Sequence, residues 1–244
     1  MATNAGIGST LARAWNLLRH NWIIIVPSIV VGACSAVVAT VLARSGWLSW
    51  QFFGDMNEQG TGAYWAFVGT VVAMALRLVA AVVAMAFTAG MAAAAWSRGR
   101  AYLADGAAVF RRNALQAFFA LILLTIIGVF AAALLVPSFG VSVLAYMTLM
   151  LYAMPAVLVG NRGAVDAVVE SIGLAWRSFG VTFVLVLLII ALAVAGGVLG
   201  DLLEHLPFLG QLLSWVLMEA VVAYATLVVV GEYLQLHGAA DQAP

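Results

Sequence analysis

Two charged residues, Arg77 and Glu219, lie inside long apolar stretches of the sequence. An ionisable side chain at membrane depth is costly unless it is paired or hydrated, which makes both residues candidates for function. Arg77 follows Tyr64 by 13 residues and Glu219 follows Gln211 by 8. Both stretches enter the membrane from one side, so the two depths match if the stretch with Arg77 begins above the membrane. The interpretations are a structural ion pair between two helices, an arginine that snorkels outward, or the lining of a polar cavity.

The sequence contains none of the phosphate-binding, zinc-protease, serine-hydrolase or paired-cysteine motifs that would indicate catalysis. Its three histidines, His20, His205 and His237, fall in segments expected on different sides of the membrane, so a metal site is not expected. The single cysteine, Cys34, excludes an intrachain disulfide and is expected to be a packing residue. We therefore predict a protein that is not an enzyme and has no cofactor.

The composition indicates that lipid is the main solvent of this chain. Of its 244 residues, 66% are hydrophobic and 8% are charged, whereas soluble domains carry about 25% charged residues. Apolar stretches of about 20 residues span a bilayer as helices. We predict an all-α polytopic integral membrane protein, a single domain over residues 1–244 with six transmembrane helices. The spans are expected near residues 22–43, 66–96, 117–136, 141–160, 181–199 and 211–233.

Individual residues refine these spans. Pro155 predicts a kink near Leu151, because proline cannot donate the backbone hydrogen bond one turn back. Gly196 and Gly200 form a GxxxG pattern that favours close helix packing. The loop 45–63 carries aromatic residues that suggest contact with the outer membrane interface. Glu232, near the inner end of the last span, is expected at the interface and not in the interior.

About three short amphipathic segments precede spans and are predicted to lie on the cytoplasmic surface of the membrane as interfacial helices. They fall near residues 9–21, 105–112 and 161–179, each with an aromatic residue, an arginine and then a span. The units 9–96, 102–160 and 165–236 therefore read as three parallel repeats. The alternative is that any amphipathic segment leading into a membrane has this pattern.

Arginine is distributed unequally between the two sides of the predicted topology. Eight arginines fall on the side of the two termini and one, Arg44, on the other. Cytoplasmic segments carry such an excess, so we predict a bacterial inner-membrane protein with both termini in the cytoplasm. Five of these arginines are candidate lipid-headgroup contacts: Arg98, Arg100, Arg111, Arg112 and Arg177. Membrane lipids are the expected partners, together with a protein partner or a second copy of the chain; nucleic acid is not expected.

Two segments, GMAAAAWSRGRAYLADGAAVFRRN (90–113) and AMPAVLVGNRGAVDAVVESIGLAWRSFG (153–180), carry a resemblance to known proteins. They resemble the membrane domain associated with bacterial glycerophosphodiester phosphodiesterases and related six-span families. In some relatives a soluble catalytic domain is fused to this membrane portion. The chain ends 11 residues after Tyr233, so no catalytic residues are carried over. The resemblance implies an integral membrane protein of undefined activity.

Two functions are compatible with these patterns. The first is a non-enzymatic membrane module for envelope organisation, lipid handling or the scaffolding of a partner. The second is a small transporter or channel with a polar path near Arg77 and Glu219. A packed bundle with an apolar groove open to lipid favours the first function, and a water-filled cavity lined by both charges favours the second.

Overall fold

The computed structural model describes residues 7–44, 61–205 and 210–240. Every regular element in these ranges is helical. The elements are α1 (Ile7–His20), the 3₁₀ helix η1 (Trp22–Ile25), α2 (Val26–Arg44), α3 (Thr61–Arg98), α4 (Leu103–Ala133), α5 (Val141–Met150), α6 (Ala153–Leu158), α7 (Ala164–Arg177), α8 (Phe179–Glu204) and α9 (Gly210–Ala240). The aromatic loop predicted over residues 45–63 lies largely outside the described residues.

The long helices have the length and apolar character of membrane spans. In the described parts of the chain, five segments pass both criteria, and a sixth is added if α1 and the helix after it are taken together. These two are bent by 91°, which agrees with the predicted corner between a surface helix and the first span. The prediction of an all-α polytopic membrane protein is confirmed.

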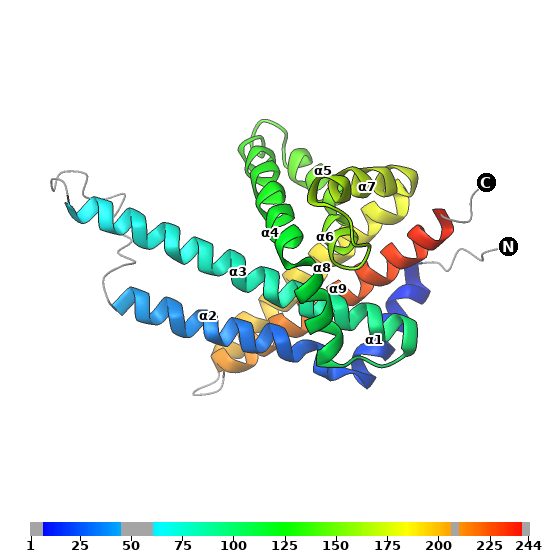
Figure 1. The fold of residues 1–244 in the computed structure, drawn as a ribbon, viewed down its shortest axis with the longest axis horizontal. Helices are drawn as coiled ribbons and strands as arrows, with labels where there is room; N and C mark the ends of the chain where they lie inside the picture. The colour runs from blue at the N-terminus through cyan, green and yellow to red at the C-terminus, as the bar shows by residue number, and fades with distance from the viewer. Residues whose placement is uncertain (1–6, 45–60, 206–209, 241–244) are drawn as a thin grey trace.

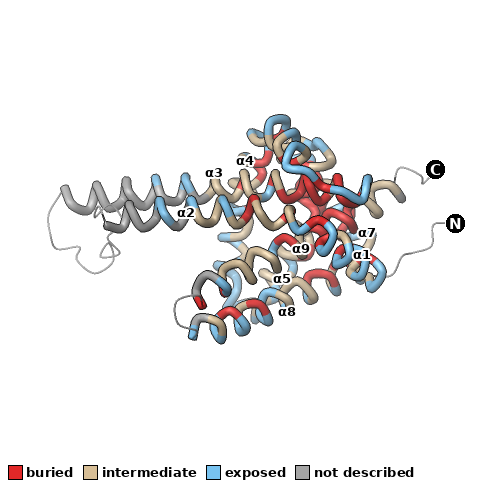
Figure 2. Tube along the Cα trace, turned by 90° about the horizontal axis from the view of Figure 1, so that it is seen from below, coloured by how far each residue is buried: buried red, intermediate tan, exposed pale blue. Residues whose placement is uncertain are grey.

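Three helical hairpins build the fold. The end at which each hairpin starts and finishes, here called its inner end, lies close to the inner ends of the other two (Figure 1). They are α2–α3, α4 with α5 and α6, and α8–α9. The two marked chain ends lie on the same side of the molecule. Buried residues concentrate where the inner ends meet (Figure 2). We call this region the hub and define it by the buried cluster around Trp96, Tyr152 and Tyr233.

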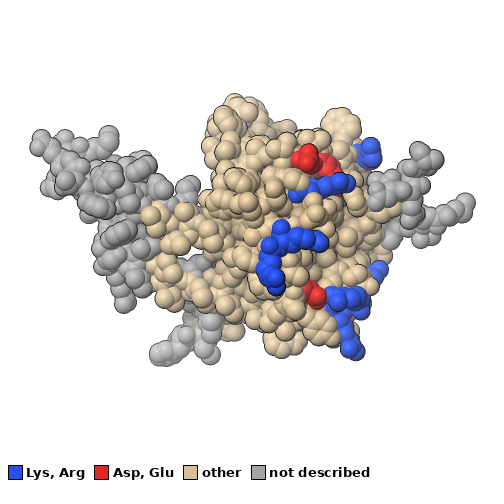
Figure 3. All heavy atoms as spheres, viewed as in Figure 1, with Lys and Arg blue, Asp and Glu red and all other residues tan. Residues whose placement is uncertain are grey.

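The helices differ in how much of their surface the protein covers. Half of the most apolar window of α3 is buried, compared with 17% in α4 and 22% in α8. α3 is therefore the central helix, and most of α4 and α8 is left for lipid. On the face seen in Figure 3, the described charged side chains lie over the half of the molecule that contains the hub. The apolar remainder is what a bilayer would cover.

Glycines allow the tightest helix contacts. A Cβ added to Gly106 of α4 would lie 2.8 Å from backbone atoms of Phe87 in α3, and one added to Gly90 would lie 2.9 Å from the Asp105 carbonyl oxygen. The predicted GxxxG contact also forms within the chain, because Gly196 faces Val221 and Gly200 faces Ser214, both on α9. Small residues thus let these helices approach closely.

One helix and one residue differ from the sequence-based expectation. The segment 105–112 is not a separate interfacial helix, because α4 continues without a break from Leu103 into the span. Asp105 does mark its beginning: its carboxylate accepts hydrogen bonds from the Tyr102 amide at 2.9 Å and from Arg98 at 2.6 Å. No glycine or proline follows Arg112 before Gly128, so nothing ends the helix. Cys34 is exposed and not a packing residue.

Candidate functional site

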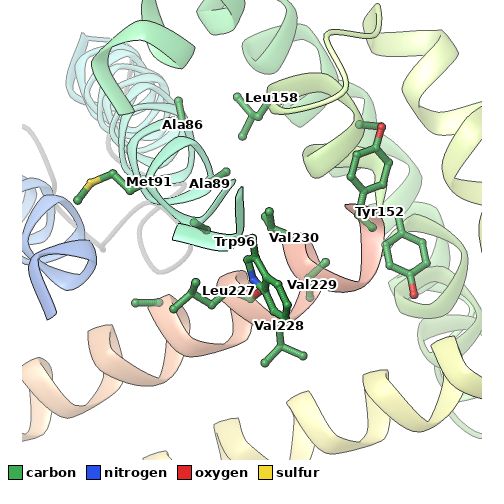
Figure 4. Packing of buried hydrophobic residues seen from close by; sticks show 14 of the residues in the cluster. Ala86, Ala89, Met91, Trp96, Tyr152, Leu158, Leu227, Val228, Val229 and Val230 are labelled. Carbon is green, nitrogen blue, oxygen red and sulfur yellow. The ribbon is translucent and has the colours of Figure 1, made fainter. Parts of the chain in front are cut away.

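Trp96, near the end of α3, ties three helices together at the hub (Figure 4). Its indole nitrogen donates a hydrogen bond to the Leu227 carbonyl of α9 at 2.8 Å. The ring packs against Gly231, where a Cβ would collide with the indole. The guanidinium of Arg13 in α1 lies 4.6 Å above the ring and donates to the Trp96 carbonyl at 3.1 Å. A cation–π contact and two hydrogen bonds therefore fix α1, α3 and α9 to each other.

Glu232 of α9 is buried, with 7% of its surface exposed. Its carboxylate accepts a hydrogen bond from Thr10 of α1 at 3.2 Å, and the Thr10 oxygen accepts one from Gln235 at 3.3 Å. The expectation of an interfacial Glu232 is therefore wrong, because α1 folds across α9 and covers the carboxylate. A position near a span end could not reveal this, since the covering residue is 222 positions away in the sequence.

A second carboxylate, Glu170 of α7, connects the surface helix to the end of α9. It accepts hydrogen bonds from Arg162 at 2.7 Å and from the Tyr233 hydroxyl at 3.0 Å, and the Nδ1 atom of His237 lies 3.2 Å from it. The Tyr233 and His237 rings stack with centroids 5.5 Å apart. This carboxylate is the most densely bonded of the described acidic groups, and its donors come from two parts of the chain far apart in sequence.

The fourth span is interrupted near Leu151, the position of the predicted kink, because α5 ends at Met150 and α6 begins at Ala153. Ser171 of α7 bonds to both sides of the break: its hydroxyl accepts from the Tyr152 amide at 3.1 Å and donates to the Leu149 carbonyl at 2.7 Å. The Tyr152 side chain is fully buried, and its hydroxyl lies 3.2 Å from that of Thr182 in α8. The broken helix is thus held by hydrogen bonds from both α7 and α8.

An apolar cavity of about 190 Å³ lies between α4, α5 and α8. It is partly open and is lined by Leu124, Tyr146, Met147, Met150, Leu151, Val186 and Ile189. The one polar group among these side chains, the Tyr146 hydroxyl, is already hydrogen-bonded to the Leu124 carbonyl at 2.9 Å. Water needs two to four polar partners, and apolar cavities of about 150 Å³ stay dry and bind apolar ligands. This cavity therefore suits a hydrocarbon group.

The predicted Arg77–Glu219 pair is described only in part. Both residues lie in long helices, α3 and α9, but the Arg77 side chain lies outside the described part of the structure. Glu219 is half-buried and hydrogen-bonded to the side chain of Trp215 one turn earlier. Trp96 and Leu227 are hydrogen-bonded to each other and give a common reference point on α3 and α9. Arg77 precedes this point by about 28 Å of helix and Glu219 by about 12 Å, so the two residues lie at different distances from it. The pairing stays a prediction.

The five candidate headgroup arginines are all exposed, but they are not equivalent. Arg98 forms an ion pair with Asp105 at 2.6 Å. Arg100, Arg111, Arg112 and Arg177 take part in none of the ion pairs formed by the described residues. Arg112 begins an exposed stripe of α4 that continues with Leu115, Phe119, Ile126 and Phe130. A cationic end on an apolar stripe is the pattern of a helix that meets lipid headgroups.

Each of the three histidines has a contact of its own in the structure. No group of three or more possible ligands occurs among the described histidine, cysteine, aspartate and glutamate residues. His20 and His205 each contact a carbonyl oxygen one turn earlier in their own helices, and His237 contacts Glu170.

Comparisons of the chain with family models, curated proteins and solved structures find no match. The resemblance to the phosphodiesterase-associated membrane domain therefore stays an expectation.

Sequence reasoning missed the Glu170 cluster, the buried Glu232 and the apolar cavity. Glu170 and Tyr233 look like ordinary polar residues of separate amphipathic segments, and nothing local indicates that α7 and α9 meet. Pro155 did give a usable signal, because a proline inside an apolar span predicts an interruption of the helix about one turn earlier. The hydrogen bonds from Ser171 of α7 at this interruption could not be predicted from the proline.

Proposed function

We propose that this chain is a non-enzymatic membrane module that takes part in lipid handling, with its hub end on the cytoplasmic side of the inner membrane. The single observation that supports this function best is the apolar cavity between α4, α5 and α8. A transport path needs polar or charged groups that stay hydrated, whereas this cavity is lined by hydrocarbon and one satisfied hydroxyl. An acyl chain of a phospholipid is the ligand that fits such a lining.

The arginines of the hub end complement this lining. Arg111 and Arg112 are exposed on α4, the helix that also contributes Leu124 to the cavity. Leu124 follows Arg112 by 12 residues, or about 18 Å of helix. The distance is comparable with half of a hydrocarbon core of about 30 Å. A single phospholipid of one leaflet can therefore place its headgroup near the arginines and its acyl chain at the level of the cavity.

The experiment is purification of the protein in native lipid, followed by mass spectrometry of the phospholipids that remain bound. Ile189→Trp fills the cavity from α8, and Val194→Trp places the same side chain on the exposed face of α8. We expect Ile189→Trp to retain less phospholipid than the wild type and Val194→Trp to retain the same amount. Equal retention in all three proteins would contradict the acyl-chain site.

A second pair of variants tests the headgroup contact. Arg111→Gln with Arg112→Gln removes two charges that no described acidic residue neutralises, while Arg98→Gln removes one that Asp105 already neutralises. We expect the double variant to lose its preference for anionic over zwitterionic phospholipid and Arg98→Gln to keep more of it. An unchanged preference in the double variant would exclude these arginines as headgroup contacts.

A further inference from the structure

The surface helix α7 has apolar residues on two sides. One side packs into the protein, where Ala167, Ser171 and Ala175 are fully buried. The other side carries Val165, Val169, Ile172 and Trp176 at spacings of four, three and four. We call these four residues the outer stripe. Val165 is 66% exposed, Val169 65% and Trp176 75%, so the outer stripe leaves a continuous apolar surface without a partner within the described chain.

The outer stripe is continuous with a surface that belongs to the membrane. Ser178 alone separates α7 from the span α8. Phe179, the first residue of α8, is half exposed and stacks on Phe183 at 5.8 Å between ring centroids. Val184 and Leu187 then continue the exposed apolar face of that span. Exposed apolar residues therefore continue along the chain from Trp176, at the end of the outer stripe, into the first turns of a membrane span.

We propose that the outer stripe of α7 lies within the bilayer, at the boundary between headgroups and acyl chains of the leaflet at the hub end. Water would leave four large apolar side chains hydrated, whereas a helix at this depth buries its apolar face by about 5–10 Å. Trp176 lies at the level that tryptophan prefers, beside Arg177 at the end of the helix. The assignment concerns the surface of α7 and does not depend on the acyl-chain cavity.

The charges around α7 fit this placement. Glu170 is turned toward Arg162, Tyr233 and His237 and is neutralised there, so it does not oppose contact with an anionic leaflet. Asp166 is exposed in the first turn, and Arg177 is exposed in the last. The polar edge of the helix thus faces the protein and the aqueous side, and the stripe faces lipid.

Fluorescence quenching by lipid tests the proposal. In a Cys34→Ser background, single cysteines replace Val169 or Ile172 in the stripe, Asp166 on the polar edge, and Val194 on the lipid face of α8. Each is labelled with bimane and reconstituted into phosphatidylethanolamine–phosphatidylglycerol vesicles with or without brominated acyl chains. Size-exclusion chromatography first selects variants that keep the wild-type elution profile. Two positions of the outer stripe are labelled separately, so that the test can still be made if one of the two variants does not fold.

We expect the labels at positions 169 and 172 to lose most of their emission in brominated vesicles, as the label at 194 does, and the label at 166 to be little changed. Unquenched stripe labels with red-shifted emission would place the stripe in water. Unquenched labels with blue-shifted emission would mean that a protein, such as a second copy of the chain, covers it. Either of these two results overturns the proposal.

Discussion

The amide of Tyr152 donates a hydrogen bond to the hydroxyl of Ser171, 3.1 Å away, at the point where Pro155 breaks the fourth span. The same hydroxyl donates to the Leu149 carbonyl at 2.7 Å. One serine of a surface helix therefore forms hydrogen bonds with two backbone groups where a membrane helix is interrupted.

Replacing Ser171 by alanine should lower the stability by about 1–3 kcal/mol, because it leaves a buried amide and a partly buried carbonyl without this partner. Thermal unfolding in detergent measures the change. Ser97→Ala is the matched control, since the exposed Ser97 hydroxyl only bonds to carbonyls of its own helix. A Ser171→Ala protein as stable as this control would show that the break does not need α7.

Gly106→Ala should separate α3 from α4. Its Cβ would lie 2.8 Å from backbone atoms of Phe87, and backbone cannot rotate away as a side chain can. We expect a destabilisation of about 1–3 kcal/mol, as for other overpacked contacts. The melting temperature is the readout.

Gly173→Ala in α7 provides the comparison for Gly106→Ala, because no atom lies within 4 Å of its added Cβ. Alanine there should be neutral or stabilise by up to about 1 kcal/mol through helix propensity. Similar melting temperatures for the two variants would argue against the close approach of α3 and α4.

Glu170→Ala should loosen the end of α9, because Arg162, Tyr233 and His237 lose a common acceptor. Hydrogen exchange of the amides in residues 234–240 is expected to accelerate, since these turns would be held by fewer contacts. Asp166→Ala, an exposed change in the same helix, should leave this exchange unchanged. Equal exchange in both variants would mean that packing alone orders the end of α9.

The predicted ion pair between Arg77 and Glu219 can be tested by a double-mutant cycle with Arg77→Gln and Glu219→Gln. If the two charges pair, each single change leaves one charge without its partner, and the double variant is no less stable than the worse single variant. Losses of melting temperature that simply add would refute the pairing. Trp215→Phe shows separately how much Glu219 depends on the indole hydrogen bond.

The sequence was sufficient to predict most of the helices, because apolar length and proline act locally. The stretch after Trp22, the kink before Pro155 and the packing of Gly196 and Gly200 all follow from residues near each other in the chain. The continuity of α4 was missed because charges at Asp105 and Arg112 suggested two helix ends, while the intervening residues contain no helix breaker.

The candidate site was less predictable, because its contacts join distant segments. Thr10 and Glu232 are separated by 222 residues, and Trp96 and Leu227 by 131. A single sequence contains no signal for such pairs. Glu232 could be placed near a span end but not beneath α1, and the apolar cavity arises only when three helices are placed side by side.

The hub gives α9 a special place in biogenesis. α9 supplies the acceptor for Trp96, the carboxylate for Thr10 and two of the donors to Glu170, and it is translated after all the other described helices. Until α9 enters the membrane, the Trp96 indole and the Thr10 hydroxyl lack these partners. The insertion of α9 is therefore the step that joins α1 and α7 to hairpins that already pack through α3 and α4, and a chain without it should be a substrate for quality-control proteases.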